Sequence, residues 1–276
     1  MIKFCKYCVI PDSKPNINFI DGVCASCYFH FYEKKKKINW KKRKKEFDIL
    51  INRIKKKKNE GFDALVPVSG GKDSITQVHY MLKAGLRVLA LNVDYGFKTT
   101  IGNHNLGLIP KMGASLFTFR PNMKLHRKVL KISFEQYGDP DLMSHCLLHA
   151  LPIKTAIKFN IPLVFLGENS AYEYSGDKTY DEKKMSLKWF QNYAANNGMT
   201  PKKFSIKHNI SFNKMDIYNL PDQDSLNRTN AVFCSYFFKW DSETNLKIAK
   251  KYGFKSLKSN SEGTYRNYVG IDEKIN

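Results

Sequence analysis

The stretch Val66-Pro67-Val68-Ser69-Gly70-Gly71-Lys72-Asp73-Ser74 decides the fold of this chain, because a buried strand, a tight glycine turn and a helix start meet there. The run before it, residues 64 to 68, is short and apolar, as in a strand, and apolar residues recur at helical spacing from 75 to 82. Two glycines let the backbone turn sharply and bring its N–H groups close to an anion. The helix that follows points its unpaired amides and positive dipole end at the same place. The stretch therefore predicts a phosphate-binding turn.

Side chains of the same stretch fit that interpretation. Lys72 adds a mobile cation, and Ser69 and Ser74 add hydroxyl donors on either side of the turn. The alternative is a structural Gly-Gly turn in which Asp73 caps the helix and no ligand binds.

Length and composition limit the class of protein. The chain has 276 residues, enough for one large α/β domain with small appendages, and 42% of them are hydrophobic. The longest apolar runs are strand-length and too short to cross a bilayer, and the first 20 residues lack a secretory leader. We therefore expect a cytoplasmic protein without a membrane span.

The formal charge of +21 raises the question of nucleic-acid binding. Much of the excess lies between residues 34 and 58, in three lysine runs. Such runs are more often a solvated helix face, so we expect no nucleic-acid partner, and nucleic-acid binding is kept as the alternative.

Four cysteines near the N-terminus form two Cys-x-x-Cys pairs, Cys5 with Cys8 and Cys24 with Cys27, separated by 15 residues. This is zinc-ribbon spacing, and a turn at Asp21-Gly22 would bring the two pairs together for tetrahedral coordination. A reducing compartment favours metal over disulfides, so we expect structural Zn²⁺, with an iron–sulfur cluster as the chemical rival.

Beyond the ribbon the pattern alternates between strands and helices, which predicts a doubly wound, mainly parallel sheet. We expect a basic connecting helix with an apolar stripe at residues 47, 50, 51 and 54. Strands are expected at 64–68, 87–93, 115–119 and 162–167, and helices at 73–84, 102–113, 122–138, 144–159, 184–195 and 245–252. The predicted organisation is a zinc ribbon at 1–33, a basic linker helix at 34–60 and an α/β domain at 61–276.

Two further positions lie at the ends of predicted strands, where ligands of such folds bind. Asp94 ends the second strand and either contacts a nucleotide or caps the turn that follows. The fourth strand ends in Gly167 and Glu168, and Glu168 could bind Mg²⁺ or a substrate hydroxyl. Aromatic stretches at 171–176 and 236–240 could stack on a ligand, although core packing is the commoner role.

The turn Ser-Gly-Gly-Lys-Asp-Ser after a strand resembles the PP-loop of the ATP pyrophosphatases, which split ATP between its α- and β-phosphates and form an adenylated intermediate. It is shorter than the loop of kinases and GTPases, which has four residues between its first glycine and Gly-Lys. The resemblance implies ATP and Mg²⁺ as ligands and places catalysis at Lys72, Asp73 and Ser74. Nucleotide-binding positions would be Val68, Ser69, Gly70, Gly71, Lys72, Asp73, Ser74, Asp94, Gly167 and Glu168.

With the four-cysteine ribbon added, the chain resembles the N-acetyl sugar amidotransferases, which make acetamidino sugars such as pseudaminic-acid derivatives of flagellin and O-antigen sugars. The similarity extends through Leu91-Asn92-Val93-Asp94 and Gly167-Glu168-Asn169 to the stretch 261–265. It implies an N-acetylated sugar substrate and a separate glutaminase that supplies ammonia. Members of that family usually continue beyond the position of Asn276, so we expect a short or truncated member.

The alternative family is the PP-loop tRNA thiolation enzymes, which share the ribbon and the loop. Those enzymes carry further catalytic cysteines, where this chain has Cys146, His149 and Cys234. These three could form a ligand set, but buried unreactive cysteines are the commoner outcome.

Overall fold

The computed structural model describes residues 2–13, 18–32, 38–57, 60–167, 182–193, 198–260 and 264–274. At its centre is a five-stranded sheet in the order β5-β4-β3-β6-β7, with every neighbouring pair parallel. The strands are β3 (Ala64–Pro67), β4 (Val88–Val93), β5 (Ser115–Phe119), β6 (Leu163–Leu166) and β7 (Asn230–Phe233). The chain builds outward from β3 in one direction and then returns to β3 and builds in the other. This reversal beside β3 confirms the doubly wound α/β fold.

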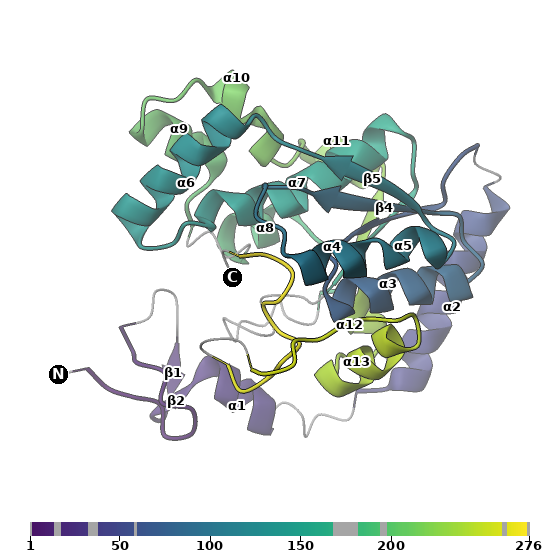
Figure 1. Cartoon of the computed structure of the whole chain (residues 1–276), viewed down its shortest axis with the longest axis horizontal. Coiled ribbons are helices and arrows are strands. Elements are labelled where there is room, and N and C mark those ends of the chain that lie inside the picture. Colours follow the sequence, from purple (N-terminus) through teal and green to yellow (C-terminus); the bar gives the residue numbers. More distant parts are fainter. Residues whose placement is uncertain are drawn as a thin grey trace.

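Alternate residues of each strand enter two different hydrophobic cores, so helices cover both faces of the sheet (Figure 1). In β3, Leu65 enters one core, and Ala64 and Val66 enter the other. The first core is closed by α6 (Met123–Tyr137), α7 (Leu142–Lys158), α8 (Leu187–Tyr193) and α9 (Pro201–Lys207). The second is closed by α2 (Trp40–Lys56), α3 (Lys72–Lys83), α12 (Cys234–Phe237) and α13 (Ser242–Lys250).

Helix α2 buries the four residues expected for its apolar stripe, Phe47, Leu50, Ile51 and Ile54, and leaves its lysines largely exposed. Its amphipathic pattern therefore packs it on the α/β domain, as the spacing predicts. No helix in the described part of the chain combines the length and apolar character needed to cross a membrane.

The N-terminal region is a small unit of its own, drawn away from the central sheet (Figure 1). Strands β1 (Phe19–Ile20) and β2 (Val23–Cys24) form an antiparallel hairpin, and α1 (Ala25–Tyr32) follows directly. The Asp21-Gly22 turn has positive φ angles of 50° and 78°, so both residues are left-handed as a two-residue hairpin requires.

Several predicted elements differ from the structure. The helix expected at 102–113 is divided into α4 (Thr100–Leu106) and α5 (Leu108–Lys111), because Pro110 has no N–H for a continuous helix. The helix expected at 184–195 begins only at Leu187, since Lys184 bridges to Val232 of β7. The last helix begins at Ser242, where the side chain of Asp241 caps it by accepting from the N–H of Thr244.

Strand β7 is absent from the predicted elements, and so are four short helical segments around it. These are α10 (Phe212–Met215), a 3₁₀ turn η4 (Asp216–Tyr218), α11 (Gln223–Asn227) and α12. Each of these helical segments is only three to five residues long, which is too short for its apolar residues to show a helical period.

Candidate active site

The glycine turn (residues 69–74) connects β3 to α3 and has the conformation that its sequence requires. Gly70 has φ +98°, a region that L-residues rarely adopt, and a Cβ atom there would lie 2.8 Å from the carbonyl oxygen of Gly102. Gly71 precedes the first residue of α3 and has no side-chain cap. The backbone thus approaches α4 at Gly70 and presents the first-turn amides of α3 at Gly71.

Both serines of the glycine turn form hydrogen bonds with the backbone of the turn itself. The Ser69 hydroxyl accepts a hydrogen bond from the Gly71 N–H at 3.1 Å, which leaves its own proton for a ligand. The Ser74 hydroxyl donates to the Gly71 carbonyl at 2.8 Å. Ser74 therefore stabilises the turn.

Lys72 and Asp73 form an ion pair at the start of α3, with 2.6 Å between Nζ and Oδ2. The other carboxylate oxygen of Asp73 accepts from the Asn245 side chain of α13 at 2.7 Å. The Lys72 ammonium also lies over the ring of Tyr268, 5.6 Å from its centroid. Lys72 is almost fully buried and does not line the cavity described next, whereas Asp73 does.

A cavity of about 390 Å³ opens at the carboxyl ends of β3, β4 and β6, directly above the glycine turn. This sheet-edge cavity lies at the strand reversal, where open α/β sheets bind ligands. Its floor comes from the strand ends and from α3, through Pro67, Val68, Leu91, Val93, Leu166, Gly167, Ser69, Asp73, Ser74 and Gln77. One stripe of α7 forms a wall, through Asp141, Ser144, His145, Leu148, His149 and Pro152.

The sheet-edge cavity has an acidic lining, although the chain is strongly basic. Its described lining includes the carboxylates of Asp73, Asp141, Asp272 and Glu273 and contains no lysine or arginine. Burial raises the pKa of Asp141, and it also raises the pKa of Glu273 despite a neighbouring lysine. An anionic ligand therefore enters most favourably together with a cation.

His149 presents one ring nitrogen as a hydrogen-bond acceptor. Its Nδ1 lies 2.8 Å from the backbone carbonyl of His145, so Nδ1 carries the proton and Nε2 keeps a lone pair. The ring packs 5.0 Å from that of Trp189, and burial lowers the pKa of His149 to about 4. The side chain is therefore neutral at physiological pH and can accept a hydrogen bond from a bound nucleophile.

Asp94 follows β4, as expected, but does not line the sheet-edge cavity. One carboxylate oxygen accepts from the Gly96 N–H at 2.8 Å, and the other pairs with Arg120. Burial opposes ionisation of Asp94, but the Arg120 guanidinium and the Gly96 N–H outweigh it and lower the pKa. Both oxygens of Asp94 thus have partners within its own turn and in Arg120, as the capping alternative predicts.

Of the predicted strand-end pair, Gly167 lines the cavity. Glu168, the aromatic stretch 171–176 and residues 261–263 lie outside the described residues. The other aromatic stretch, 236–240, packs against the second core, with the ring of Phe238 stacked on Tyr80 at 3.9 Å between centroids.

The sequence did not indicate Gln77 or the C-terminal carboxylates as parts of the site, and of the α7 stripe it indicated only His149, in the possible set with Cys146 and Cys234. On α7, residues 141, 144, 145, 148, 149 and 152 recur at helical spacing, but they mix polar and apolar types and resemble an ordinary surface face. Asp272 and Glu273 are about 200 residues beyond the glycine turn, and only tertiary structure brings them to it.

The four N-terminal cysteines come together as predicted. One Sγ atom from each of Cys5, Cys8, Cys24 and Cys27 lies within 4.8 Å of the others, and all four are free thiols. Burial opposes ionisation of Cys5, but N–H donors from Cys24, Tyr7 and Cys8 outweigh it and lower the pKa to about 6. Four converging sulfurs with N–H donors fit a closed structural Zn²⁺ site.

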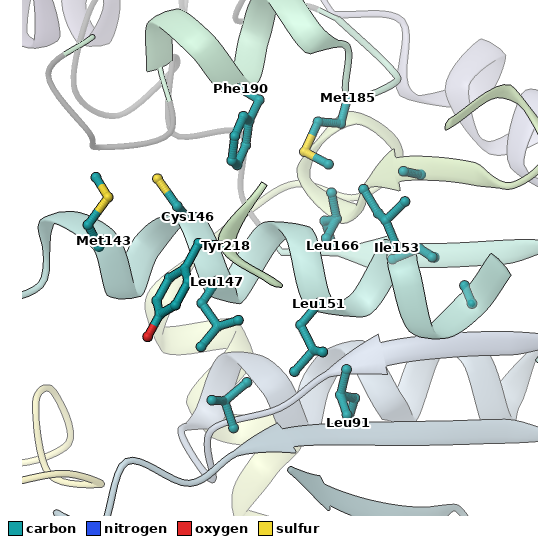
Figure 2. Packing of buried hydrophobic residues seen from close by; sticks show 14 of the residues in the cluster. Leu91, Met143, Cys146, Leu147, Leu151, Ile153, Leu166, Met185, Phe190 and Tyr218 are labelled. Carbon is teal, nitrogen blue, oxygen red and sulfur yellow. The ribbon is translucent and has the colours of Figure 1, made fainter. Parts of the chain in front are cut away.

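The two remaining cysteines do not form a metal site with His149. Cys146 belongs to the first core, on the side of α7 that Phe190 covers (Figure 2), and Cys234 belongs to the second core, across the sheet. Within the described residues, the four-cysteine cluster is the only group of three or more potential ligands with converging atoms. Both cysteines are buried, in agreement with the first part of the expectation of buried, unreactive cysteines.

No protein-family model and no curated protein matches this chain. Among solved structures, it is similar to an NMN synthetase from Francisella tularensis, with a TM-score of 0.36, 13% identity and coverage of 78% of this chain and 93% of that one. It is also similar to an NH3-dependent NAD synthetase from Campylobacter jejuni, with a TM-score of 0.36, 14% identity and coverage of 79% and 96%. TM-scores at this level support no functional assignment for this chain.

Proposed function

We propose that this chain is an ATP-dependent amidotransferase of the PP-loop ATP pyrophosphatase type, which converts the N-acetyl group of a sugar to an acetamidino group. The supporting observation is the glycine turn: Gly70 has a positive φ, and residues of the turn and of the start of α3 line a cavity of about 390 Å³ at the strand reversal. A backbone cradle beside a cavity of this size suits a nucleotide and part of a second substrate. The sugar class, a nonulosonic acid such as pseudaminic acid or an O-antigen sugar, comes from the sequence resemblance alone.

An amide oxygen is a poor leaving group, and adenylation makes it a good one. The oxygen of the N-acetyl group attacks the α-phosphorus of ATP, and pyrophosphate leaves with the electrons of the broken P–O bond. Ammonia then attacks the imidate carbon, AMP leaves with the amide oxygen, and an acetamidine remains. The first step needs stabilisation of negative charge on the departing pyrophosphate, which preorganised amides supply.

The residues near the glycine turn would divide this work. The first-turn amides of α3, at Lys72 and Asp73, bind the pyrophosphate, and the Ser69 hydroxyl, which accepts from the Gly71 N–H, donates a further hydrogen bond. The Lys72 ammonium, which does not line the cavity, would act through its ion pair with Asp73, which does. Mg²⁺, when bound with ATP, adds positive charge in a cavity whose own lining is acidic.

The α7 wall would receive the acceptor sugar and ammonia. It offers polar groups at Asp141, Ser144 and His145 and the lone pair of His149 Nε2. His149 Nε2 is placed to accept a hydrogen bond from the attacking ammonia and orient it, because the ring is neutral and is held by a backbone carbonyl. Ammonia would come from a separate glutaminase, as the family resemblance implies.

The remaining organisation follows from the same proposal. Residues 1–33 form a ribbon that holds one Zn²⁺, 34–60 a linker helix, and 61–276 the nucleotide and substrate domain. Metal analysis of the purified protein should give one zinc ion per chain and no visible absorbance from an iron–sulfur cluster. An iron–sulfur spectrum would overturn the zinc assignment.

The thiolation alternative is less well supported, because it needs a reactive sulfur centre beside the nucleotide. Cys146 and Cys234 lie in different cores on opposite faces of the sheet, and neither lines the sheet-edge cavity. A sulfur carried between those two positions would have to cross the sheet.

The deciding experiment incubates the zinc-loaded protein with ATP, Mg²⁺, ammonium and a panel of N-acetylated nonulosonic acids and O-antigen sugars. We expect AMP release that depends on one sugar, together with a product in which an amidine replaces the amide. AMP release only with tRNA and a sulfur donor would favour the thiolation alternative. No AMP release with either acceptor would contradict both.

A further inference from the structure

Strand β5 forms one edge of the central sheet and, among the described residues, pairs on one side only, with β4 (Figure 1). Three of its five residues, Ser115, Phe117 and Thr118, are exposed. Natural proteins usually protect an edge strand with a charged residue or a proline, because its unpaired N–H and C=O groups can pair with another chain. The sequence of β5, Ser-Leu-Phe-Thr-Phe, contains neither. The outer backbone of β5 is therefore open to an added strand.

The opposite edge of the sheet, β7, has the cover that β5 lacks. Residues 183–185 run along β7, where the Met185 N–H donates to the Ala231 carbonyl and the Phe233 N–H donates to the Lys183 carbonyl. In the described part of the chain, the backbone hydrogen bonds of β5 go only to β4 and to the N–H of Asp94, which follows β4. The two edges therefore differ in whether the chain itself covers them.

A groove of about 480 Å³ lies beside β5, on the face of the sheet that α7 covers. We call it the β5 groove. Phe117 and Phe119, which are two residues apart on β5 and so point to one face, line it together with Leu151 of α7 and Phe159 at the end of α7. Phe117 is 40% exposed and Phe159 is 52% exposed. Large apolar side chains that are exposed together beside a hollow indicate a binding surface.

The charged side chains of the β5 groove are mostly basic. Lys154, Lys158 and Lys214 line it, and the one acid in its described lining, Asp216, pairs with Lys154 at 2.7 Å. Lys158 and Lys214 are exposed and have no ion-pair partner among the described residues. An occupant that carries carboxylates beside an apolar group would therefore complement this groove in both charge and hydrophobicity.

Two other occupants fit the β5 groove less well. A second copy of this chain, paired edge to edge through β5, would bring the same lysines together across a two-fold axis in a protein of charge +21. A nucleic acid would satisfy the lysines but would leave the outer N–H and C=O groups of β5 unpaired. An extended peptide pairs with those groups and can also carry the acidic and apolar side chains.

We propose that the β5 groove binds an extended acidic segment of a partner protein, which adds a strand to β5. A large apolar residue of the segment enters the groove beside Phe117 and Phe159, and neighbouring carboxylates pair with Lys158 and Lys214. No residue lines both this groove and the sheet-edge cavity. The inference is therefore independent of the proposed reaction.

The test measures the fluorescence anisotropy of labelled synthetic peptides with the whole chain. Each probe peptide has one phenylalanine or leucine flanked by Asp and Glu, and each control peptide has Lys in place of every acid. We expect the acidic peptides to bind, and the double variant Lys158→Glu, Lys214→Glu to bind them about 10-fold more weakly or worse. The matched control, Lys83→Glu with Lys250→Glu, makes the same charge change at exposed lysines of α3 and α13, which cover the other face of the sheet, and should bind as the wild type does.

Hydrogen exchange and a change at Phe117 test the added strand. A saturating acidic peptide should slow amide exchange in residues 115–119 and leave that of β7 unchanged, because only β5 has an open edge. Phe117→Thr keeps a residue that favours strands at an exposed position, so the Tm should change little. The same change removes an aromatic contact and should weaken peptide binding by about 10-fold or more.

Four results would overturn the inference. The first is the absence of binding by every acidic peptide, and the second is equal binding of the lysine peptides. The third is a uridine oligonucleotide that binds the wild type but not the Lys158→Glu, Lys214→Glu variant while the acidic peptides do not bind, which would assign the groove to nucleic acid. The fourth is a dimer of the wild type that Phe117→Thr dissociates, which would assign the groove to a second copy of this chain.

Discussion

The sheet-edge cavity carries four carboxylates and no lysine or arginine in its described lining, whereas α2 carries a dense run of lysines and arginines on its exposed face. The charges of α2 face solvent, where water and salt weaken them. The charges of the cavity are partly buried, and burial raises the pKa of Asp141 and Glu273. The net charge of +21 thus describes the surface of this protein and gives the wrong sign for its site.

The largest expected effect comes from Lys72. Lys72→Ala removes the buried cation that pairs with Asp73, and we expect AMP formation to fall by about 100-fold or more while zinc content stays unchanged. Lys83→Ala, at the exposed far end of α3, is the matched control and should keep wild-type turnover. Unaltered turnover in Lys72→Ala would remove Lys72 from the proposed mechanism.

A comparison of Gly70 with Gly113 distinguishes the cost of a positive φ from the effect of the close approach between the glycine turn and α4. Both have φ near +100°, but a Cβ atom at Gly70 would meet the Gly102 carbonyl, whereas Gly113 has nothing within 4 Å. Gly113→Ala should cost about 1–2 kcal/mol of unfolding free energy from strain alone. Gly70→Ala should cost more and should also weaken ATP binding in isothermal calorimetry. If Gly70→Ala and Gly113→Ala lost the same stability and both bound ATP as the wild type does, the close approach of Gly70 to Gly102 would have no role in ATP binding.

A smaller effect is expected from His126, which stacks on the cavity residue Tyr95. Burial lowers the pKa of His126 to about 4, below the usual 6.5, so the unfolded chain binds the proton more readily than the folded protein. Stability contributed in this way is complete above pH 6.5 and is lost as the pH falls towards 4. Between about pH 7.5 and pH 5 the unfolding free energy should fall by about 2 kcal/mol through this residue.

Urea unfolding of the wild type and of His126→Gln at both pH values measures this contribution. The variant cannot take up the proton, so its unfolding free energy should depend less on pH than that of the wild type. Parallel pH dependence of the two proteins would show that His126 does not titrate in this range.

The smallest effect is expected on α2. A triple change of the exposed residues Lys41, Lys45 and Lys56 to Gln should leave the KM for ATP within about 2-fold of the wild-type value, because screened surface charges act weakly over a distance. A loss of tRNA binding in this variant, measured by filter binding, would instead give α2 a role with nucleic acid. A large rise in the KM for ATP would contradict the claim that the charges of α2 act only at the surface and not on the sheet-edge cavity.

The parts of the fold that the sequence predicts are strands and helices with a clear apolar pattern, and turns whose own residues restrict the backbone conformation. Strands β3 to β6 are short, largely apolar runs in the sequence. The glycine turn is specified locally, because Gly70 has a positive φ that glycine adopts readily and other residues do not. Strand β7 is a four-residue run beside short helices, so its place depends on pairing with β6. Asp272 and Gln77 could not be found from the sequence, because their place in the cavity lining is a property of the packed molecule.

The central claim is that the glycine turn binds the leaving pyrophosphate of ATP. The most direct measurement supplies ATP labelled at the α-phosphate, with ammonium, Mg²⁺ and the sugar identified in the screen, separates the labelled nucleotides and assays the unlabelled pyrophosphate. We predict labelled AMP with an equal amount of pyrophosphate from the wild type, and about a hundredth or less of either product from Lys72→Ala in the same time. Labelled ADP, or AMP formed equally well by both proteins, would contradict the claim.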